Sequence, residues 1–549
     1  MPRSFFSFSM FLLLSACSSN GGQSVNDSRS GVEIRSDRFV PDEDDVATID
    51  TESADITSTD VILADLVVPK DIGEISELVE DGPDVGSTDK LSFAGPLASQ
   101  QRGPLVLDFV VEQMAGLKEY DVFVDWQSAD GEFNPCTALT GYSDDSLTGI
   151  KEIEQRRFVW DSMADIQADI NDVRLRLRVF LSGTPVELFS GSFSLFNDPA
   201  RVRQVLLTHA INGDNRVRQL SWTHDNGLGA VGGDPAGEVH TIGTSPRRVT
   251  FSPNGRFAAI IEEGNETLRM MSFDLLTGTL LNSRVEDVPG MYPVDIEFAG
   301  DGARLFIVNS SPDADGGLYQ VPFDAQEGGF VSGETPQQIH SQYVPGDLEL
   351  LPDGRGLAML AADPGGNMNG IYLLVMDLLG EVLGETGIGP EGSSSRNVTA
   401  SPDGSRLLVT YSNLFGNGER VVLVNLDSTG HPTVAGDMEV EGPEEAVFAS
   451  DSVTALVTEA MNNKVTGLSV SGPVLTKGTS FKAGLAARVA HTRWGPDRDI
   501  FLITTVSSST GQSGLAVAEL GSGGQVTNLG TYEIGDGIDK IPGDVAVQP

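Results

Sequence analysis

The chain has 549 residues, and its 79 Asp and Glu outnumber its 35 Lys and Arg to give a formal net charge of −44. Such an acidic surface repels phosphate backbones, which argues against nucleic acid as a partner. The length exceeds that of one ordinary core, and 63 glycines with 39% hydrophobic residues favour several domains of short strands and tight turns.

Residues 1–17 have the pattern of an export signal. Arg3 supplies a positive charge, and an apolar stretch from Phe5 to Leu14 follows that is too short for a stable transmembrane helix. The run Leu14-Ser15-Ala16-Cys17 resembles the lipobox of bacterial lipoproteins. That resemblance implies cleavage before Cys17, lipidation of its thiol, attachment to a membrane through the lipid and, with Ser18 next, sorting to the outer membrane. An ordinary signal peptide with a chance cysteine is the alternative.

Residues 18–90 are strongly acidic, with 19 Asp or Glu against 5 Lys or Arg. Aromatic residues are nearly absent, so this stretch cannot bury enough apolar area to offset its conformational entropy. We expect a disordered tether that like charges keep extended.

Residues 91–198 change to short segments rich in Val, Phe and Leu. The segment VRLRLRVFL alternates polar and apolar residues, as a strand with one wet face does. About seven such strands predict a β-sandwich. The run FVWDS at 158–162, followed by VRLRLRVF and FSLFND, resembles fibronectin-III-like or Ig-like modules of bacterial surface proteins.

Residues 203–549 are periodic. Each copy has a short alternating strand, a turn of the Pro-Asp-Gly type, an apolar second strand and two further strands. Six copies align on their turns at Gly255, Gly302, Gly354, Gly404, Ser452 and Arg498. Four strands per repeat predict the blades of a β-propeller. The SPDG turns with the strands that follow resemble YVTN-type propeller repeats, as in lactonase-like and surface-layer proteins.

The two ends of this region complete a further blade. Residues 203–243 match strands two to four of a blade that lacks its first strand, and IPGDVAVQP at 541–549 matches a first strand that lacks its blade. We therefore predict an all-β chain, with a seven-bladed propeller that the C-terminal strand closes and an N-terminal sandwich.

One polar position precedes the first apolar residue of each first strand. It holds Arg248, Asp295, Asp347, Asn397, Glu445, His491 and, through closure, Asp544. Two residues further on, the same side of each strand presents Thr250, Glu297, Glu349, Thr399, Val447, Arg493 and Ala546. First strands line the channel of a propeller, so these side chains predict a polar ring at one mouth. The ring can bind a small polar ligand or a hard cation such as Ca²⁺; the alternative is that it only satisfies backbone groups.

The sequence contains none of the common hydrolase, zinc-protease, nucleotide or haem motifs. We expect a non-enzymatic binding or scaffold role in the cell envelope, with a protein, a glycan or a small molecule as ligand and no required cofactor. The alternative is a lactonase-like or other hydrolytic propeller, with Arg248, Glu445 and His491 as its channel-mouth set.

Overall fold

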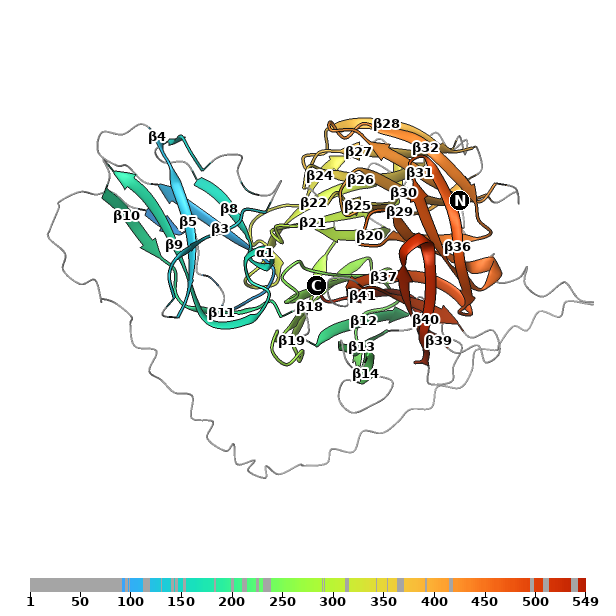
Figure 1. The fold of residues 1–549 in the computed structure, drawn as a ribbon, viewed down its shortest axis with the longest axis horizontal. Coiled ribbons are helices and arrows are strands. Elements are labelled where there is room, and N and C mark those ends of the chain that lie inside the picture. The colour runs from blue at the N-terminus through green and yellow to red at the C-terminus, as the bar shows by residue number, and fades with distance from the viewer. Residues whose placement is uncertain are drawn as a thin grey trace, which may run out of the picture. The chain divides into compact units, whose positions relative to one another are not determined.

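The computed structural model describes most of residues 91–549 (Figure 1). Outside the described residues lie 1–90 and short stretches of the rest, the longer ones being 112–118, 231–237, 363–369, 507–512 and 535–541. The predicted signal, Cys17 and the acidic tether therefore lie outside the described residues. None of the helices in the described part has the length and apolar character to cross a bilayer.

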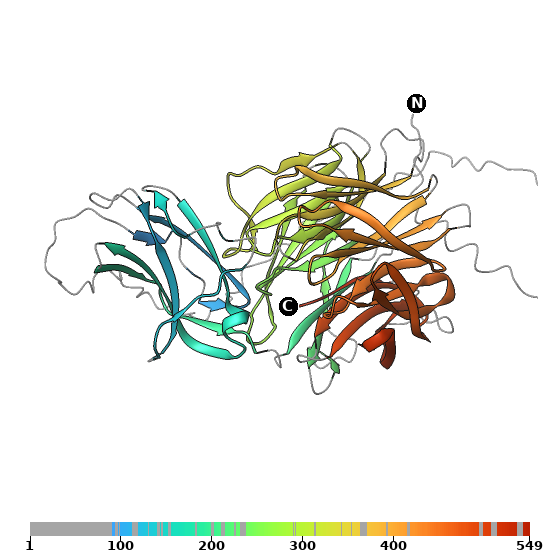
Figure 2. The same ribbon diagram turned by 45° about the horizontal axis from the view of Figure 1, so that its top comes forward.

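The N-terminal part of the described chain is a β-sandwich, as predicted. One sheet has the order β1 (Leu91–Phe93), β3 (Pro104–Val111), β8 (Gln155–Asp161). The other has the order β2 (Gln100–Gln101), β11 (Phe193–Phe196), β9 (Asp169–Leu181), β5 (Val122–Ser128), β6 (Asn134–Pro135), with β10 (Thr184–Phe189) also paired to β9. Figure 2 shows these strands in blue to teal.

The two sandwich sheets share one core. Strand β3 alternates buried and half-buried residues along its whole length, and β9 buries Val173, Leu175, Leu177 and Val179 while its arginines face outward. The core includes Phe109 and Trp160, both fully buried, and Cys136 packs partly buried against it. A short pair, β4 (Glu119–Tyr120) with β7 (Ile150–Lys151), and a one-turn helix, α1 (Ser162–Asp165), complete the domain. The resemblance to fibronectin-III or Ig modules stays a prediction.

Seven further sheets are present in the described residues, and each is one blade of the predicted propeller. Blade 1 is β16 (Pro246–Phe251), β17 (Phe257–Glu262), β18 (Thr267–Phe273) and β19 (Leu280–Asp287). Blade 2 is β20 (Pro293–Phe298), β21 (Arg304–Asn309), β22 (Gly317–Asp324), β23 (Gly329–Phe330) and β24 (Gln337–His340). Blade 3 is β25 (Val344–Leu350), β26 (Leu357–Ala362), β27 (Ile371–Met376) and β28 (Val382–Gly389).

The remaining blades repeat this plan. Blade 4 is β29 (Ser393–Ala400), β30 (Arg406–Asn413), β31 (Arg420–Leu426) and β32 (Pro432–Glu439). Blade 5 is β33 (Pro443–Phe448), β34 (Thr454–Glu459), β35 (Lys464–Ser471) and β36 (Val474–Lys482), and blade 6 is β37 (Leu485–Arg493), β38 (Asp499–Val506), β39 (Ser513–Gly521) and β40 (Gln525–Glu533). Blade 7 is β12 (Arg203–His209), β13 (Arg216–Thr223), β14 (Gly227–Ala230) and β15 (Glu238–Thr241), joined by β41 (Pro542–Val547).

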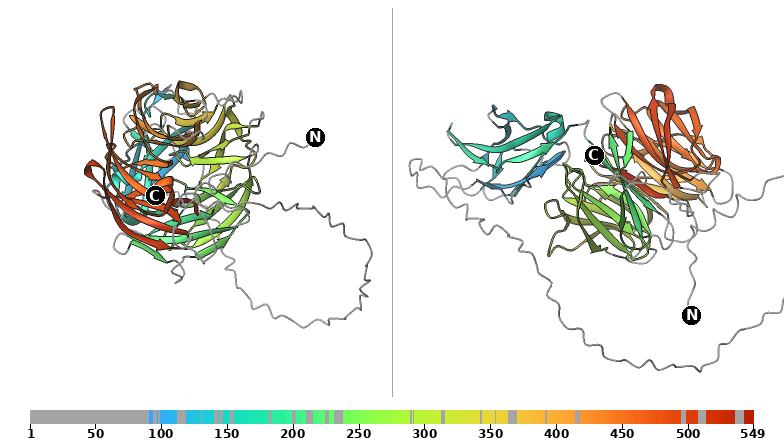
Figure 3. Two further views of the ribbon diagram at one scale, coloured as in Figure 1. Left: turned by 90° about the vertical axis from the view of Figure 1, so that its right-hand side faces the viewer. Right: turned by 90° about the horizontal axis from the view of Figure 1, so that it is seen from below.

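The C-terminal strand closes the ring, as the repeat count predicts. Strand β41 runs antiparallel to β12, with Val545 opposite Leu207 and Val547 opposite Val205. Figure 1 shows β41 beside β12, and in Figure 3 the blades follow one another around the C-terminus from green through yellow to red. The first strands also contact one another in a closed cycle, in the order β16, β20, β25, β29, β33, β37, β41 and back to β16.

The sequence pattern of each blade explains its place in the ring. The second strands β17 and β34 are buried at every position, because a neighbouring blade covers each of their faces. The tight turn between first and second strands carries Gly at 255, 302, 354 and 404, with φ between 65° and 69°, and Ser452 adopts φ 58° at the same place. Glycine adopts this left-handed backbone without steric cost, so the turn recurs in the same form and aligns the first strands.

Candidate functional site

Five of the predicted ring residues are bound to the backbone of the next blade. Each side-chain oxygen accepts a hydrogen bond from the amide that follows the neighbouring blade's ring position. The bonds are Leu348 N to Asp295 (2.8 Å), Val398 N to Asp347 (2.7 Å), Ala446 N to Asn397 (3.2 Å), Val489 N to Glu445 (2.7 Å) and Val249 N to Asp544 (3.1 Å). The ring is therefore a chain of inter-blade links that joins the first strands.

Arg248 is the centre of an ion-pair cluster within this ring. Its guanidinium group contacts a carboxylate oxygen of Asp347, lies 3.2 Å from Asp295 and 3.9 Å from Asp544, and its side chain is only 11% exposed. Because a buried charge without a partner is costly, the three carboxylates are what allow this arginine to lie here. Arg248 is thereby held in place by acidic side chains from three other blades.

Where the preceding blade carries an arginine in the ring, the backbone amide after the next ring position needs a different hydrogen-bond acceptor. Arginine has no acceptor, so Arg248 cannot accept from the amide of Ile296. Asp295 accepts that hydrogen bond itself, from Ile296 N to its own Oδ1 at 3.0 Å, while its other oxygen accepts from Leu348 N. A carboxylate after an arginine therefore has two backbone bonds to accept. Asp544 shows the same arrangement: burial raises its pKa, and backbone bonds from Val249 and Val545 are among the contacts that oppose the rise.

The structure does not bring His491 into the ring, and Arg488 takes its place. The amide of Val489, the residue after Arg488, donates to Glu445, and Arg488 N is bound to Thr504 Oγ1 at 2.9 Å. In two other blades the backbone N–H of the ring residue also donates to a threonine hydroxyl of the second strand, from Glu445 N to Thr458 and from Asp544 N to Thr208. The matching bond of Arg488 therefore marks it as the ring residue of blade 6. Burial raises the pKa of Asp347, Glu445 and Asp544, and the charge of Arg488 opposes that rise in all three, as expected for a group that faces them.

His491 lies three residues further along β37. Its Nε2 is 2.7 Å from Asp499 Oδ1, and its ring lies 4.8 Å from that of Phe501 at a tilt of 32°. The shift arises because the hairpin of β37 and β38 is three residues longer than the others: Val489 pairs with Ile503, whereas Ala446 pairs with Val457. Aligning the repeats on the turn therefore misplaced the ring residue of blade 6.

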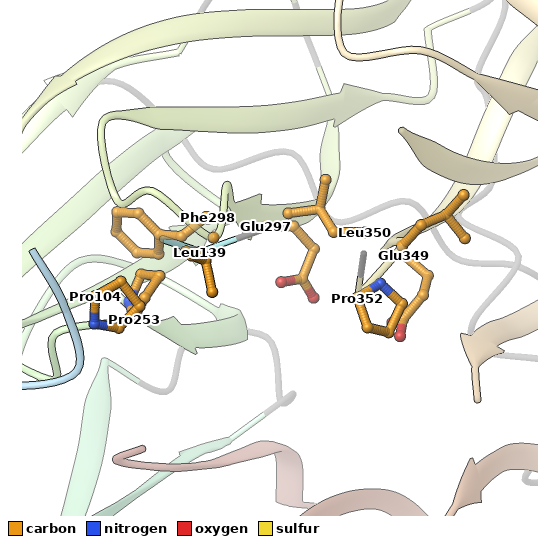
Figure 4. A pocket seen from close by; sticks show the side chains of 10 residues that line it. Pro104, Leu139, Pro253, Glu297, Phe298, Glu349, Leu350 and Pro352 are labelled. Carbon is orange, nitrogen blue, oxygen red and sulfur yellow. The ribbon is translucent and has the colours of Figure 1, made fainter. Parts of the chain in front are cut away.

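A second layer of the channel is formed two residues after the ring, and it contains Glu297 and Glu349. Both are partly exposed and both line a pocket of about 290 Å³. Figure 4 shows their side chains with the other lining groups, which are Pro104 and Leu139 of the sandwich and Pro253, Phe298, Leu350 and Pro352 of the propeller. The pocket thus combines two carboxyl groups with a largely apolar lining.

The two pocket carboxyls differ from those of the ring in their partners. Glu349 accepts one hydrogen bond, from Ala400 N at 3.1 Å, whereas the carboxyl of Glu297 has no hydrogen-bond partner among the described residues. Burial raises the pKa of Glu349 to about 8, with Asp295 and Glu445 adding to it and the Ala400 amide opposing it. Burial, and then Glu349 and Asp295, hold the pKa of Glu297 well above its usual range.

The pocket carboxyls occupy positions that the sequence already places on the ring side of the first strands, but they were not included in the predicted site. Their residue type could have identified them from the sequence. Two glutamates are unusual in a layer whose other members include Thr250, Thr399 and Ala546. In the part of the chain that the structure describes, no three His, Cys, Asp or Glu side chains are grouped so as to hold a metal ion.

Comparisons with known proteins find solved structures of low sequence identity. No family model matches the chain, and no curated protein matches it. A periplasmic gluconolactonase of Pseudomonas aeruginosa has 18% identity and a TM-score of 0.47, over 64% of this chain and 99% of the other. A Bacteroides fragilis protein with a proposed assignment as 6-phosphogluconolactonase has 16% identity and a TM-score of 0.46, over 63% of this chain and 98% of the other. A Desulfotomaculum acetoxidans protein of unknown function has 16% identity and a TM-score of 0.44, over 63% and 98%. The likeness concerns the all-β propeller alone.

Proposed function

We propose that this chain is a non-enzymatic ligand-binding protein of the cell envelope, anchored by a lipid on Cys17, with its ligand in the channel pocket beside Glu297 and Glu349. One observation carries the binding role: the ring side chains are occupied with one another and with the backbone, while the next layer presents two carboxyls to an open pocket. Ligand sites are typically concave, mostly apolar and provided with a few polar groups.

The occupied ring weighs against the hydrolytic alternative. That alternative needs Arg248, Glu445 and His491 to face one substrate, but Arg248 is paired with three carboxylates and His491 is bound to Asp499. A catalytic arginine must be free to contact developing charge on the substrate. What the alternative retains is Glu349, whose pKa of about 8 suits a proton donor at neutral pH.

The test sets binding against turnover on the same protein. The full chain is incubated with small molecules of several charge types and with a set of lactones, and both its melting temperature and the fate of each compound are measured. We expect stabilisation by a compound that is recovered unchanged, and loss of that effect in Glu297→Gln and Glu349→Gln. Lactone hydrolysis that disappears in Glu349→Gln would overturn the non-enzymatic role.

The anchor has its own test. Cells that express the chain are labelled with a fatty acid, and the wild type is compared with Cys17→Ser. We expect label and membrane association in the wild type only, because a thioether-linked diacylglycerol requires the thiol of that residue. Equal membrane association of the variant would contradict the proposal.

A further inference from the structure

Among the described side chains of the ring and of the pocket layer, acidic groups outnumber basic ones. Its ring positions carry two guanidinium groups, those of Arg248 and Arg488, against four carboxyls, those of Asp295, Asp347, Glu445 and Asp544. Arg248 is already in contact with three of these carboxyls, and Arg488 acts on the pKa of three. Arg248 is therefore engaged by ring carboxyls, and Arg488 lies near enough to three of them to act on their pKa.

Glu297 and Glu349 add two carboxyls without adding a cation. The charged groups that act on Glu297 are the carboxyls of Glu349, Asp295 and Asp347 and the guanidinium of Arg248. Those that act on Glu349 are both acidic, Asp295 and Glu445. Each pocket carboxyl thus faces mainly like charge, and Glu297 has no hydrogen-bond donor among the described residues.

The rest of the pocket lining is apolar and suits the hydrocarbon part of a ligand. Its lining includes Phe298, which is 5% exposed, and Leu351, which is fully buried, together with proline rings from several segments. A volume of about 290 Å³ lies at the lower end of the range for small-molecule sites. A bare metal ion leaves the apolar walls without a partner, and a neutral molecule leaves the two carboxyls without a counter-charge once they are ionised.

We infer that the pocket binds a small organic cation, with an ammonium or similar group between the carboxyls of Glu297 and Glu349 and its carbon part against Phe298 and the prolines. The inference rests on the proposed binding function and specifies its ligand class. An ammonium group offers donors to both carboxyls, and its charge compensates a pair that the chain itself leaves uncompensated.

Binding of such a cation displaces protons. The cation favours the ionised form of both carboxyls, so a group that is protonated in the free protein loses its proton when the ligand enters. Glu349, with a pKa of about 8, is mostly protonated at pH 7. The affinity is therefore expected to rise between pH 6 and pH 8, by about tenfold per pH unit for each proton that the ligand displaces.

The experiment uses n-butylammonium and n-pentylammonium as probes, with n-pentanol as the neutral counterpart, n-valerate as the anionic one and CaCl₂ as the metal. Binding to the full chain is measured by isothermal titration calorimetry at pH 6, 7 and 8, in two buffers with different ionisation enthalpies. We expect the ammonium probes alone to bind, with proton release at pH 7 and at least a tenfold loss of affinity in Glu297→Gln and in Glu349→Gln.

The matched control is Glu334→Gln. Glu334 is an exposed acidic residue of the same blade as Glu297, so its variant removes the same charge from the surface and reports any non-specific attraction of cations to this acidic protein. Equal losses in Glu334→Gln and Glu297→Gln would overturn the inference. So would Ca²⁺ or n-pentanol binding as well as n-butylammonium, but those results would leave the binding function intact. If neither these probes nor the broader set of compounds binds, both proposals fail.

Discussion

The ring and the pocket layer are two residues apart on the same strands, yet they differ in what their acidic side chains do. Asp295 accepts two backbone hydrogen bonds and pairs with Arg248, whereas Glu297, on the same face of β20, has no hydrogen-bond partner among the described residues. The difference follows from the backbone, because five of the seven amides next to the ring donate to an acceptor side chain of the preceding blade. The ring carboxylates therefore link the blades, Glu349 does so through one bond from Ala400 N, and Glu297 has neither carboxyl oxygen bound to another described residue.

Removing the closing strand is the most severe way to break the ring. Truncation before Pro542 deletes β41 and with it Asp544, and it exposes the free edge of β12. We expect insoluble protein or loss of cooperative unfolding, since an open hydrophobic edge favours aggregation. Solubility, gel filtration and a circular dichroism melt check this.

The control for the truncation is Asp544→Asn, which retains the strand and an acceptor for Val249 N but loses the charge that faces Arg248. It should fold and remain monomeric. A soluble, fully cooperative truncated protein would show that blade 7 is stable without its C-terminal strand.

Removing the central cation is the next largest change. Arg248→Met leaves Asp295, Asp347 and Asp544 without their shared partner, and loss of one partner from a buried ion cluster costs about 3–5 kcal/mol. Arg247→Met is the matched control, because Arg247 is the adjacent residue and pairs with Glu263, which is 43% exposed. Exposed pairs of that kind contribute about 0–1 kcal/mol. Urea unfolding of both variants measures the difference, and equal losses would mean that the ring cluster is not the stabilising feature.

Changes in the pocket layer are expected to have the opposite sign. A carboxyl with a raised pKa in the folded state stabilises the protein only while it keeps its proton, so stability falls as pH rises from its usual value of 4.5 toward about 8 for Glu349. Glu349→Gln removes this loss while its amide oxygen can still accept from Ala400 N. We expect the variant to be more stable than the wild type at pH 9, on the order of 1 kcal/mol because pocket solvent screens the charge.

The pH dependence makes this prediction specific. Near pH 5 the carboxyl of wild-type Glu349 is protonated, and the variant and the wild type should unfold at about the same denaturant concentration. Thermal or urea unfolding at pH 5, 7 and 9 follows the growing difference. A variant that is less stable than the wild type at pH 9 would contradict the unpaired state of this layer.

The repeat predicted most of this architecture because the tight turn recurs at nearly constant spacing. Turns at Gly255, Gly302 and Gly354 place the ring residues of three blades correctly. The incomplete blades at 203–243 and 541–549 predicted that the ends pair and that Asp544 belongs to the ring. Such periodicity reports backbone geometry directly, since one turn type demands the same left-handed residue in each copy.

The sequence did not predict where that spacing changes. In blade 6 the hairpin is three residues longer, and only the pairing of Val489 with Ile503 and the acceptor at Glu445 reveal that Arg488 is the ring residue. The repeat pattern could not predict the pocket either, because its lining comes from segments that are far apart in the sequence. Its lining combines Pro104 of β3 with Pro253 and Pro352 of different blades, and the lack of a partner for Glu297 depends on side chains that the repeat does not specify.

The smallest expected effect tests this correction directly, by comparing Arg488→Met with His491→Gln. Arg488 faces Glu445 and Asp544, so its loss should destabilise the protein by about 2 kcal/mol near pH 8, where Glu445 with its pKa of about 7 is largely ionised. The effect should shrink toward pH 6 as Glu445 gains its proton.

In His491→Gln the glutamine can still donate to Asp499 and loses only the ring contact with Phe501, so we expect a loss of stability of about 1 kcal/mol or less. Urea unfolding at pH 6 and 8 measures both variants. A larger loss of stability in His491→Gln than in Arg488→Met would contradict the assignment of Arg488 as the ring residue of blade 6.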